Sequence, residues 1–225
     1  MNSIRAGSVP DAVSFFQFGD DHKSKLKNKS LRFRVTKRMV DFTTAVIAMP
    51  IVFGVSIVLL VLNPFANPGP LFFKQQRMGQ GGRPFVLWKF RTMTTAGGGV
   101  RGHDDPVETA RITPLGRVMR RLRIDELPNF FNVLAGDMCL VGPRPDAYDH
   151  AQEYIGSIPH YAKRFRVKPG ITGLAQIRGG YADNPNAVRR KARLDLFYVR
   201  RSSGRLDAYV IKRTLGVIAT GFGAK

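Results

Sequence analysis

An uninterrupted apolar run constrains this chain more than any other feature of its sequence. From Thr43 to Leu62 it reads TTAVIAMPIVFGVSIVLLVL, with no charged side chain. A helix rises about 1.5 Å per residue, so this run is long enough to cross a hydrocarbon core of about 30 Å. It begins too far into the chain, and lacks the small-residue cleavage site, for a signal peptide. We expect a membrane segment; the alternative is a buried helix of a soluble protein, which is usually shorter.

Pro50 lies within this run. A proline removes one backbone donor and clashes with the preceding turn, so we expect a kink or break near Ala48 and Met49. Basic residues flank both sides of the run: Lys23, Lys25, Lys27, Lys29, Arg32, Arg34, Lys37 and Arg38 before it, and Lys74, Arg77, Arg83, Lys89 and Arg91 after it. Such residues mark cytoplasmic flanks. A re-entrant helix over residues 36–66, broken at Pro50, keeps both flanks there and is preferred to a straight span.

The net charge of the chain limits the classes of binding partner that we expect. The 225 residues carry 36 Lys and Arg against 16 Asp and Glu, a formal net charge of +20. This balance favours nucleic acid, an anionic membrane surface or phosphate-bearing substrates. No recognisable nucleic-acid-binding motif accompanies it, so no nucleic-acid partner is expected. The single cysteine, Cys139, excludes internal disulfides and a zinc site built on several thiolates, and is interpreted as a small core residue.

The pattern of the remaining chain predicts an α+β fold dominated by helices. Residues 71–75 and 85–90 are short strand-like runs separated by Gly79 to Gly82, which indicates a β-hairpin. Helical signals occur around residues 114–123, 127–134, 147–165, 187–200 and 206–218. The last of these carries both apolar and basic residues, so it fits a helix in the membrane interface or one that faces the core.

The strongest candidate for chemistry is the stretch Arg120-Arg-Leu-Arg-Ile-Asp-Glu-Leu-Pro128. Its adjacent carboxylates, Asp125 and Glu126, follow three arginines that end at Arg123. An aspartate can attack phosphorus, and Mg²⁺ is usually held by one or two carboxylates plus substrate phosphates. Nearby guanidinium groups are expected to keep both carboxylates ionised by lowering their pKa values, and to bind phosphate. A surface cluster of salt bridges is the alternative.

Two further motifs are weaker by themselves. In Leu140-Val-Gly-Pro-Arg-Pro145, two prolines fix the backbone around Arg144, which suits recognition of phosphate or uracil or simply forms a turn. Residues 168–176, KPGITGLAQ, form a Gly/Pro loop that runs into an apolar stretch. The sequence has no GxxxxGK[ST], no GxGxxG after a strand and no HExxH, and its four histidines lack metal-ligand spacing.

Taken in order, three motifs identify a family. They are Lys89-Phe-Arg-Thr-Met93, the run IDELPNFFNVLAGDMCLVGPRP over residues 124–145, and KPGITGLAQ over residues 168–176. Together they closely resemble the bacterial sugar transferase family, the monotopic phosphoglycosyl transferases that initiate exopolysaccharide, O-antigen and glycoprotein glycan assembly. The resemblance covers roughly residues 36–220. The chain departs from it at Met49-Pro50, where many members have Ser-Pro, and at Cys139, where serine is common.

The resemblance implies transfer of a sugar 1-phosphate from a UDP-sugar to polyprenyl (undecaprenyl) phosphate, with release of UMP. It implies that Asp125 is the nucleophile, which forms a phosphosugar-aspartyl intermediate, and that Glu126 helps to bind Mg²⁺. Lys89, Arg91 and Arg144 lie in the family's basic motifs and are expected to contact phosphate, as is Arg123. Compact size and motif wording look most like exopolysaccharide-initiating members that use UDP-galactose or UDP-glucose.

The composition of the N-terminal residues and the resemblance of the rest together indicate an organisation and a location. Residues 1–35 are expected to be a mobile basic tail, 36–66 the re-entrant membrane helix, and 67–225 a catalytic domain with interfacial helices. Such a protein is monotopic on the cytoplasmic face of the bacterial inner membrane, against anionic phospholipid, and downstream glycosyltransferases are candidate partners. The alternative function is a non-catalytic basic protein that binds the membrane surface.

Overall fold

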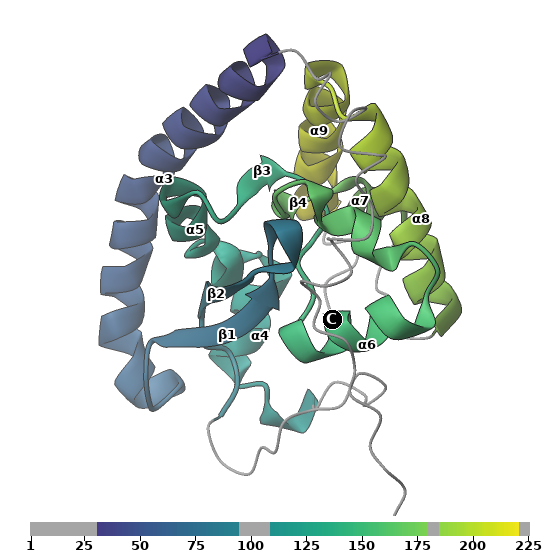
Figure 1. Ribbon diagram of the computed structural model, residues 1–225. Helices are drawn as coiled ribbons and strands as arrows, with labels where there is room; N and C mark the ends of the chain where they lie inside the picture. Colours follow the sequence, from purple (N-terminus) through teal and green to yellow (C-terminus); the bar gives the residue numbers. More distant parts are fainter. Residues whose placement is uncertain (1–30, 95–108, 180–184, 221–225) are drawn as a thin grey trace, which may run out of the picture.

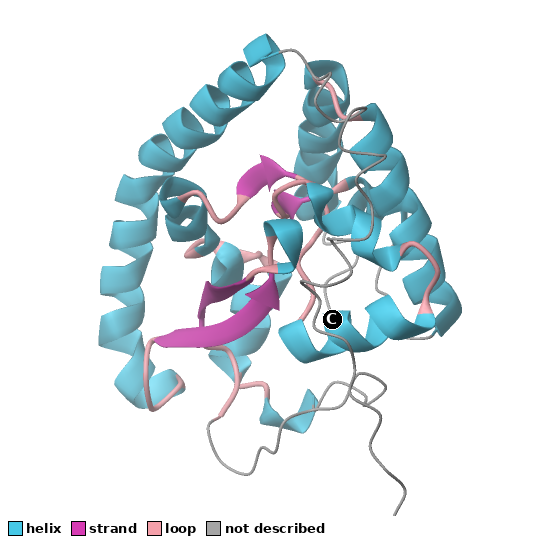
Figure 2. Ribbon diagram, viewed as in Figure 1, coloured by secondary structure: helices cyan, strands magenta, loops and turns pink. Residues whose placement is uncertain are grey.

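Helices dominate the fold, and two small sheets lie between them (Figures 1 and 2). A computed structural model describes residues 31–94, 109–179 and 185–220, so the expected tail falls largely outside the described residues. The elements are α3 (Leu31–Ala66), β1 (Phe72–Met78), η2 (Gln80–Gly82), β2 (Pro84–Phe90), η3 (Thr109–Arg111), α4 (Pro114–Arg121), η4 (Ile124–Glu126), α5 (Asn129–Ala135), β3 (Cys139–Val141), α6 (Tyr148–Ser157), η5 (Tyr161–Arg166), β4 (Gly170–Thr172), α7 (Leu174–Gly179), α8 (Pro185–Arg201) and α9 (Gly204–Thr220).

The long helix α3 contains the predicted membrane segment. It continues through Pro50 and Pro64, so the helix does not stop at the proline, and Figure 1 shows α3 changing direction along its length. Among the described residues α3 is the one helix that is long and apolar enough to cross a membrane, by length and composition. Only 17% of its most apolar 18-residue window is buried inside the protein. The rest of the fold therefore leaves most of this apolar surface uncovered.

Polar side chains near the start of α3 fix it to the body of the protein. The Lys37 ammonium donates to Asp207 Oδ2 of α9 at 2.7 Å and to the Val141 carbonyl of β3 at 3.0 Å. Asp41, which is buried, accepts from the Leu140 backbone N–H at 3.0 Å. These contacts join α3 to strand β3 and to the last helix.

The predicted hairpin is confirmed. Strands β1 and β2 pair antiparallel from Phe72 opposite Phe90 to Met78 opposite Pro84. The turn between them uses Gly81 and Gly82 at φ 71° and 76°, a left-handed conformation that glycine adopts without steric cost. One face of the hairpin supplies Leu87 to a core cluster with Ala45 of α3 and Val133 of α5.

A second pairing, which the sequence did not predict, joins two of the motifs. Strands β3 and β4 run parallel, with Cys139 opposite Gly170 and Val141 opposite Thr172. The backbones approach so closely that a Cβ on Gly170 would lie 2.1 Å from the Gly142 nitrogen. Cys139 is buried, which confirms the prediction of a small core residue, and burial raises the pKa of its thiol to about 12.

The prediction of one helix over residues 147–165 is wrong. Helix α6 ends at Ser157, and a separate 3-10 helix, η5, begins at Tyr161. His160, between them, has a left-handed backbone at φ 65°. Pro159 follows Ile158, which is extended, and the residue before a proline is sterically driven away from the α conformation. The other predicted helices correspond to α4, α5, α8 and α9.

Substitution Gly170→Ala should destabilise the protein by roughly 2–3 kcal/mol or more, because the new methyl group meets backbone atoms that cannot rotate away. Gly156→Ala in α6 is the matched control, since no atom lies within 4 Å of the place that its new methyl group would take. Urea unfolding of both variants measures the difference. Equal midpoints for the two variants would contradict the close approach of β3 and β4.

Candidate active site

The two adjacent carboxylates lie on the short helix η4, between α4 and α5. Thr113 caps α4 by accepting from the Gly116 N–H at 3.0 Å. The chain then leaves α4 through Arg123, whose left-handed backbone at φ 58° redirects it into η4. A positive φ at a residue other than glycine is uncommon and is found at functional sites. The turn presents Asp125 and Glu126 in different surroundings.

Glu126 is held by three cations from three segments. Arg144 donates to both carboxylate oxygens, Nη2 to Oε1 at 2.6 Å and Nη1 to Oε2 at 3.0 Å. Arg123 Nη1 and Lys89 Nζ lie 3.6 and 3.8 Å from Oε1. Burial alone would raise the pKa of Glu126, but Arg144 and Lys89 hold it well below its usual range. Glu126 is therefore ionised, as predicted.

Asp125 lies in a different environment, and the prediction of a lowered pKa is wrong for it. Its side chain is buried, and its Oδ1 has no hydrogen-bond partner among the described residues. Burial raises the pKa of Asp125, and the neighbouring charge of Glu126 adds to this, against the opposing charges of Lys89 and Arg144. Removal from water outweighs the cations here, and no donor within the described part of the chain reaches Oδ1 to offset it.

Burial and the neighbouring Glu126 also shift the pKa values of the cations in the site. Lys89 projects from β2, and desolvation lowers its pKa to about 8 despite the opposing effect of Glu126. Arg144, in the loop after β3, has its pKa raised by Glu126. Asp125, Glu126, Lys89, Arg123 and Arg144 thus form one cluster, which we call the carboxylate cluster; its formal charge is +1. This suits a polyanionic ligand.

Arg91 does not join the carboxylate cluster. Its guanidinium donates to the Pro70 carbonyl at 2.6 Å, to Asn67 Oδ1 at 3.0 Å and to the Met93 carbonyl at 2.9 Å. It also donates to the Asn67 carbonyl. These contacts fix the end of α3 to the end of β2. The Arg91 guanidinium thus donates its hydrogen bonds to protein oxygens and does not offer them to a phosphate.

The carboxylate cluster fits Mg²⁺ only together with a substrate. Among the described residues no three His, Cys, Asp or Glu side chains gather as a ready-made metal site. Mg²⁺ is commonly held by one or two carboxylates plus substrate phosphates, however, and Glu126 is ionised while Asp125 has an oxygen without a donor. The surrounding cations disfavour a metal that arrives alone. The donor set therefore fits a metal that arrives with a diphosphate.

Sequence reasoning missed residues that surround Arg144. Arg77 of β1 donates to the Pro145 carbonyl at 3.0 Å. Asn129 of α5 lines a small pocket together with Arg77 and Arg144, and its buried Oδ1 has no hydrogen-bond partner among the described residues. Arg164 of η5 donates to the Arg144 carbonyl at 2.7 Å. Of the residues in this network, Asp146 directly follows the Pro-Arg-Pro motif and could have been found from that position.

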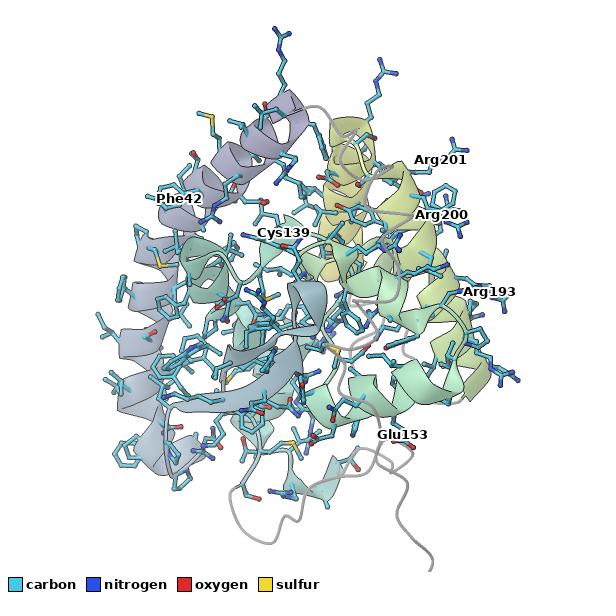
Figure 3. The ribbon with its side chains drawn as sticks, viewed as in Figure 1. Phe42, Cys139, Glu153, Arg193, Arg200 and Arg201 are labelled. Atoms are coloured by element: carbon cyan, nitrogen blue, oxygen red, sulfur yellow. The ribbon has the colours of Figure 1, made fainter. Side chains whose placement is uncertain are left out.

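Side chains on the outer surface differ between the two sides of the molecule. Figure 3 shows Arg193, Arg200 and Arg201 pointing outward from α8, whereas Phe42 lies on α3 at the opposite side. Phe42 is one of many exposed large apolar side chains on α3. The protein therefore has an apolar side formed by α3 and a basic side formed by α8.

Comparison with known proteins gives a family match over most of the chain. The sequence profile of a family described as "Bacterial sugar transferase" matches residues 32–221. A UDP-N-acetylgalactosamine-undecaprenyl-phosphate N-acetylgalactosaminephosphotransferase of Aeromonas hydrophila is 41% identical over 192 residues, which are 84% of this chain and 45% of that protein.

Two UDP-glucose:undecaprenyl-phosphate glucose-1-phosphate transferases are also similar. The protein of Xanthomonas campestris pv. campestris is 39% identical over 92% of this chain and 42% of its own length. The protein of Caulobacter vibrioides is 37% identical over 82% of this chain and 70% of its own length. The chain thus spans less than half the length of the Aeromonas and Xanthomonas relatives.

A double-mutant cycle should measure the link between Arg144 and Glu126. We expect Arg144→Gln and Glu126→Gln to show a coupling of about 1–3 kcal/mol in urea unfolding, because either change alone removes the two charged hydrogen bonds that join this pair. Arg123→Gln with Glu126→Gln is the matched control and should couple by less than about 1 kcal/mol, since that pair is longer and more exposed. Additive effects for the Arg144 pair would contradict the geometry.

Proposed function

The chain belongs to the bacterial sugar transferase family, and on that premise we propose that it transfers a sugar 1-phosphate from a UDP-sugar to undecaprenyl phosphate and releases UMP. The observation that carries the proposal is Asp125, a buried carboxylate with one oxygen free of hydrogen bonds within the described residues, beside a glutamate held by Arg144. The names of the relatives support the donor class and the lipid acceptor. Sequence similarity to the family spans residues of all three motifs.

In the first step, Asp125 attacks the phosphorus next to the sugar. A bond forms between a carboxylate oxygen and this phosphorus, and the bond from the phosphorus to the bridging oxygen of the diphosphate breaks. UMP leaves with the bridging oxygen and its electron pair, and the sugar phosphate remains on Asp125. A carboxylate oxygen that accepts no hydrogen bond keeps its electron pairs available, which suits a nucleophile.

In the second step, an oxygen of undecaprenyl phosphate attacks the same phosphorus. The aspartyl-phosphorus bond breaks, Asp125 regains its negative charge, and the product is undecaprenyl diphosphate sugar. Lys89, Arg123 and Arg144 provide the positive charge that both phosphate substrates require. Because the same nucleophile is regenerated, one cluster serves both half-reactions.

Mg²⁺ is part of the proposal, with Glu126 as the residue that holds it together with the diphosphate. When bound, the metal supplies charge neutralisation to the diphosphate and to the leaving UMP. Glu126 stays ionised at neutral pH because Arg144 and Lys89 surround it, so its carboxylate carries the negative charge that a metal ligand needs. The bidentate grip of Arg144 fixes the orientation of that carboxylate.

We further propose that α3 is re-entrant: it enters and leaves the inner membrane on the cytoplasmic face, with Pro50 at the bend. Its exposed apolar surface needs a cover that the described fold does not provide. A lipid acceptor cannot leave the bilayer, so an active site that uses it lies at the bilayer surface. The arginines of α8, on the side opposite to α3, then face the water phase and attract the anionic nucleotide (Figure 3).

The sugar is proposed to be galactose or glucose, for the first membrane step of exopolysaccharide assembly. Of the three relatives described above, two are named for glucose and one for N-acetylgalactosamine, so the relatives differ in their sugar. Downstream glycosyltransferases that extend the product are proposed partners. The interfacial placement of α9, whose exposed face carries Ile211 and Leu215, belongs to the same proposal.

Substitution Asp125→Asn should reduce UMP release by more than about 10³-fold, because the amide cannot form the acyl phosphate that links the sugar phosphate to Asp125. The assay uses protein in nanodiscs with Mg²⁺, undecaprenyl phosphate and a panel of UDP-sugars. Asp149→Asn, at an exposed position of α6, is the control for the same chemical change and should keep full activity.

Two outcomes of this assay would contradict the proposal. Release of UDP instead of UMP would mean direct glycosyl transfer. Absence of nucleotide release with every donor, from folded protein that binds membranes, would favour the non-catalytic membrane-surface protein.

A further inference from the structure

The loop that carries Arg144 is held at four consecutive carbonyl groups by donors from three elements, β1, η5 and β4. The donors and acceptors are Gly170 N to Pro143 O at 3.0 Å, Arg164 Nη2 to Arg144 O at 2.7 Å, Arg77 Nη1 to Pro145 O at 3.0 Å and Met78 N to Asp146 O at 3.1 Å. Two of these four bonds come from arginine side chains. Few other conformations would satisfy all four acceptors, so the backbone on both sides of Arg144 is fixed.

Arg164 makes the most extensive of these contacts. Its side chain is 1% exposed, and it reaches Asp195 Oδ2 of α8 with Nε at 3.0 Å and with Nη2 at 2.7 Å. Its Nη1 donates to the Asp146 carboxylate and, at 3.1 Å, to the Tyr161 hydroxyl. One guanidinium thus binds Asp195 of α8 and Tyr161 of its own helix η5. It also binds Arg144 and Asp146 in the loop after β3.

The charges around Arg164 balance. Asp146 and Asp195 carry two negative charges, and Arg164 and Lys191 carry two positive charges; Lys191 donates to the other oxygen of Asp146. Buried charges are tolerated where they are paired and hydrogen-bonded, and removal of one member leaves another unpaired. The group therefore acts as a unit, and a change in one member is expected to move the others.

We propose that Arg164 is a positioning residue for phosphosugar transfer. It fixes the backbone of Arg144, and the fixed backbone places the Arg144 guanidinium where it holds Glu126. This inference rests on the proposed function for its kinetic consequence, but not for its structural one. The path has three links: Asp195 to Arg164, Arg164 to the Arg144 carbonyl, and Arg144 to Glu126.

The chemistry of the side chain explains why an arginine stands at this position. Arginine presents five N–H donors in a rigid plane, whereas lysine presents a compact ammonium on a flexible stem. Four acceptors from Asp146, Asp195, Tyr161 and the Arg144 carbonyl lie around Arg164. A lysine keeps the charge at this position but cannot reach all of them at once.

The structural test uses the coupling between Arg144 and Glu126, measured by urea unfolding in three backgrounds. In Arg164→Lys this coupling should lose at least half of its wild-type value, because Arg144 is no longer fixed. Asp195→Asn removes one charge without a change in shape and should reduce this coupling by a smaller amount. It provides the test if Arg164→Lys does not fold. Tyr198→Phe is the matched control: it removes a buried hydroxyl that bonds Val141 O and Asp207, away from this network, and should leave the coupling unchanged.

The kinetic test measures UMP release by the same variants. Misplacement of a positioned group by about 1 Å can cost roughly 10²-fold, so we expect a loss of that order in kcat for Arg164→Lys and about tenfold for Asp195→Asn. Tyr198→Phe should lower the unfolding midpoint without a comparable loss of kcat.

The outcomes separate the two proposals. An unchanged Arg144–Glu126 coupling in both network variants would overturn the positioning role, whatever their activity. Equal kinetic losses in Tyr198→Phe and in the network variants would also overturn it, because general destabilisation would then explain both. A reduced coupling in a protein whose wild type releases no UMP would uphold the positioning of Arg144 and refute the proposed function.

Discussion

The paired hydrogen bonds between Arg144 and Glu126 are the interaction on which the site depends. They join η4 to the loop after β3 and so bring together two residues that lie 18 positions apart in the sequence. An ionised glutamate at this depth requires such a partner, since a buried charge without one is costly. The parallel pairing of β3 with β4, the hairpin residue Arg77 and the buried Arg164 all fix the loop that carries Arg144.

This interaction also separates the roles of two neighbouring carboxylates. Arg144 grips Glu126 with two hydrogen bonds, so the pKa of Glu126 is lowered while burial raises that of Asp125. Neighbouring groups whose surroundings shift their pKa values in opposite directions are typical of sites in which the two do different work. The separation is consistent with a glutamate that holds charge and an aspartate that reacts.

The sequence predicted the features that have a clear local signature, and missed those that depend on distant contacts. The apolar length of α3, the strand-like runs and glycines of the hairpin, and the Asp-Glu pair could all be recognised locally. Strands β3 and β4 have only three residues each, too few to show a period. Arg91 stands in a basic motif, but nothing nearby reveals that Asn67 and Pro70 occupy its donors. The raised pKa of Asp125 comes from burial, which no spacing of charges discloses.

The central claim is the covalent step at Asp125, and intact-protein mass spectrometry tests it most directly. The protein is mixed with a UDP-sugar and Mg²⁺ in the absence of undecaprenyl phosphate, and then quenched in acid. The account predicts a mass increase equal to one sugar phosphate less one water, located on the peptide that contains Asp125 and absent from Asp125→Asn. Turnover to undecaprenyl diphosphate sugar with no such adduct, or an adduct on Glu126 instead, would contradict it.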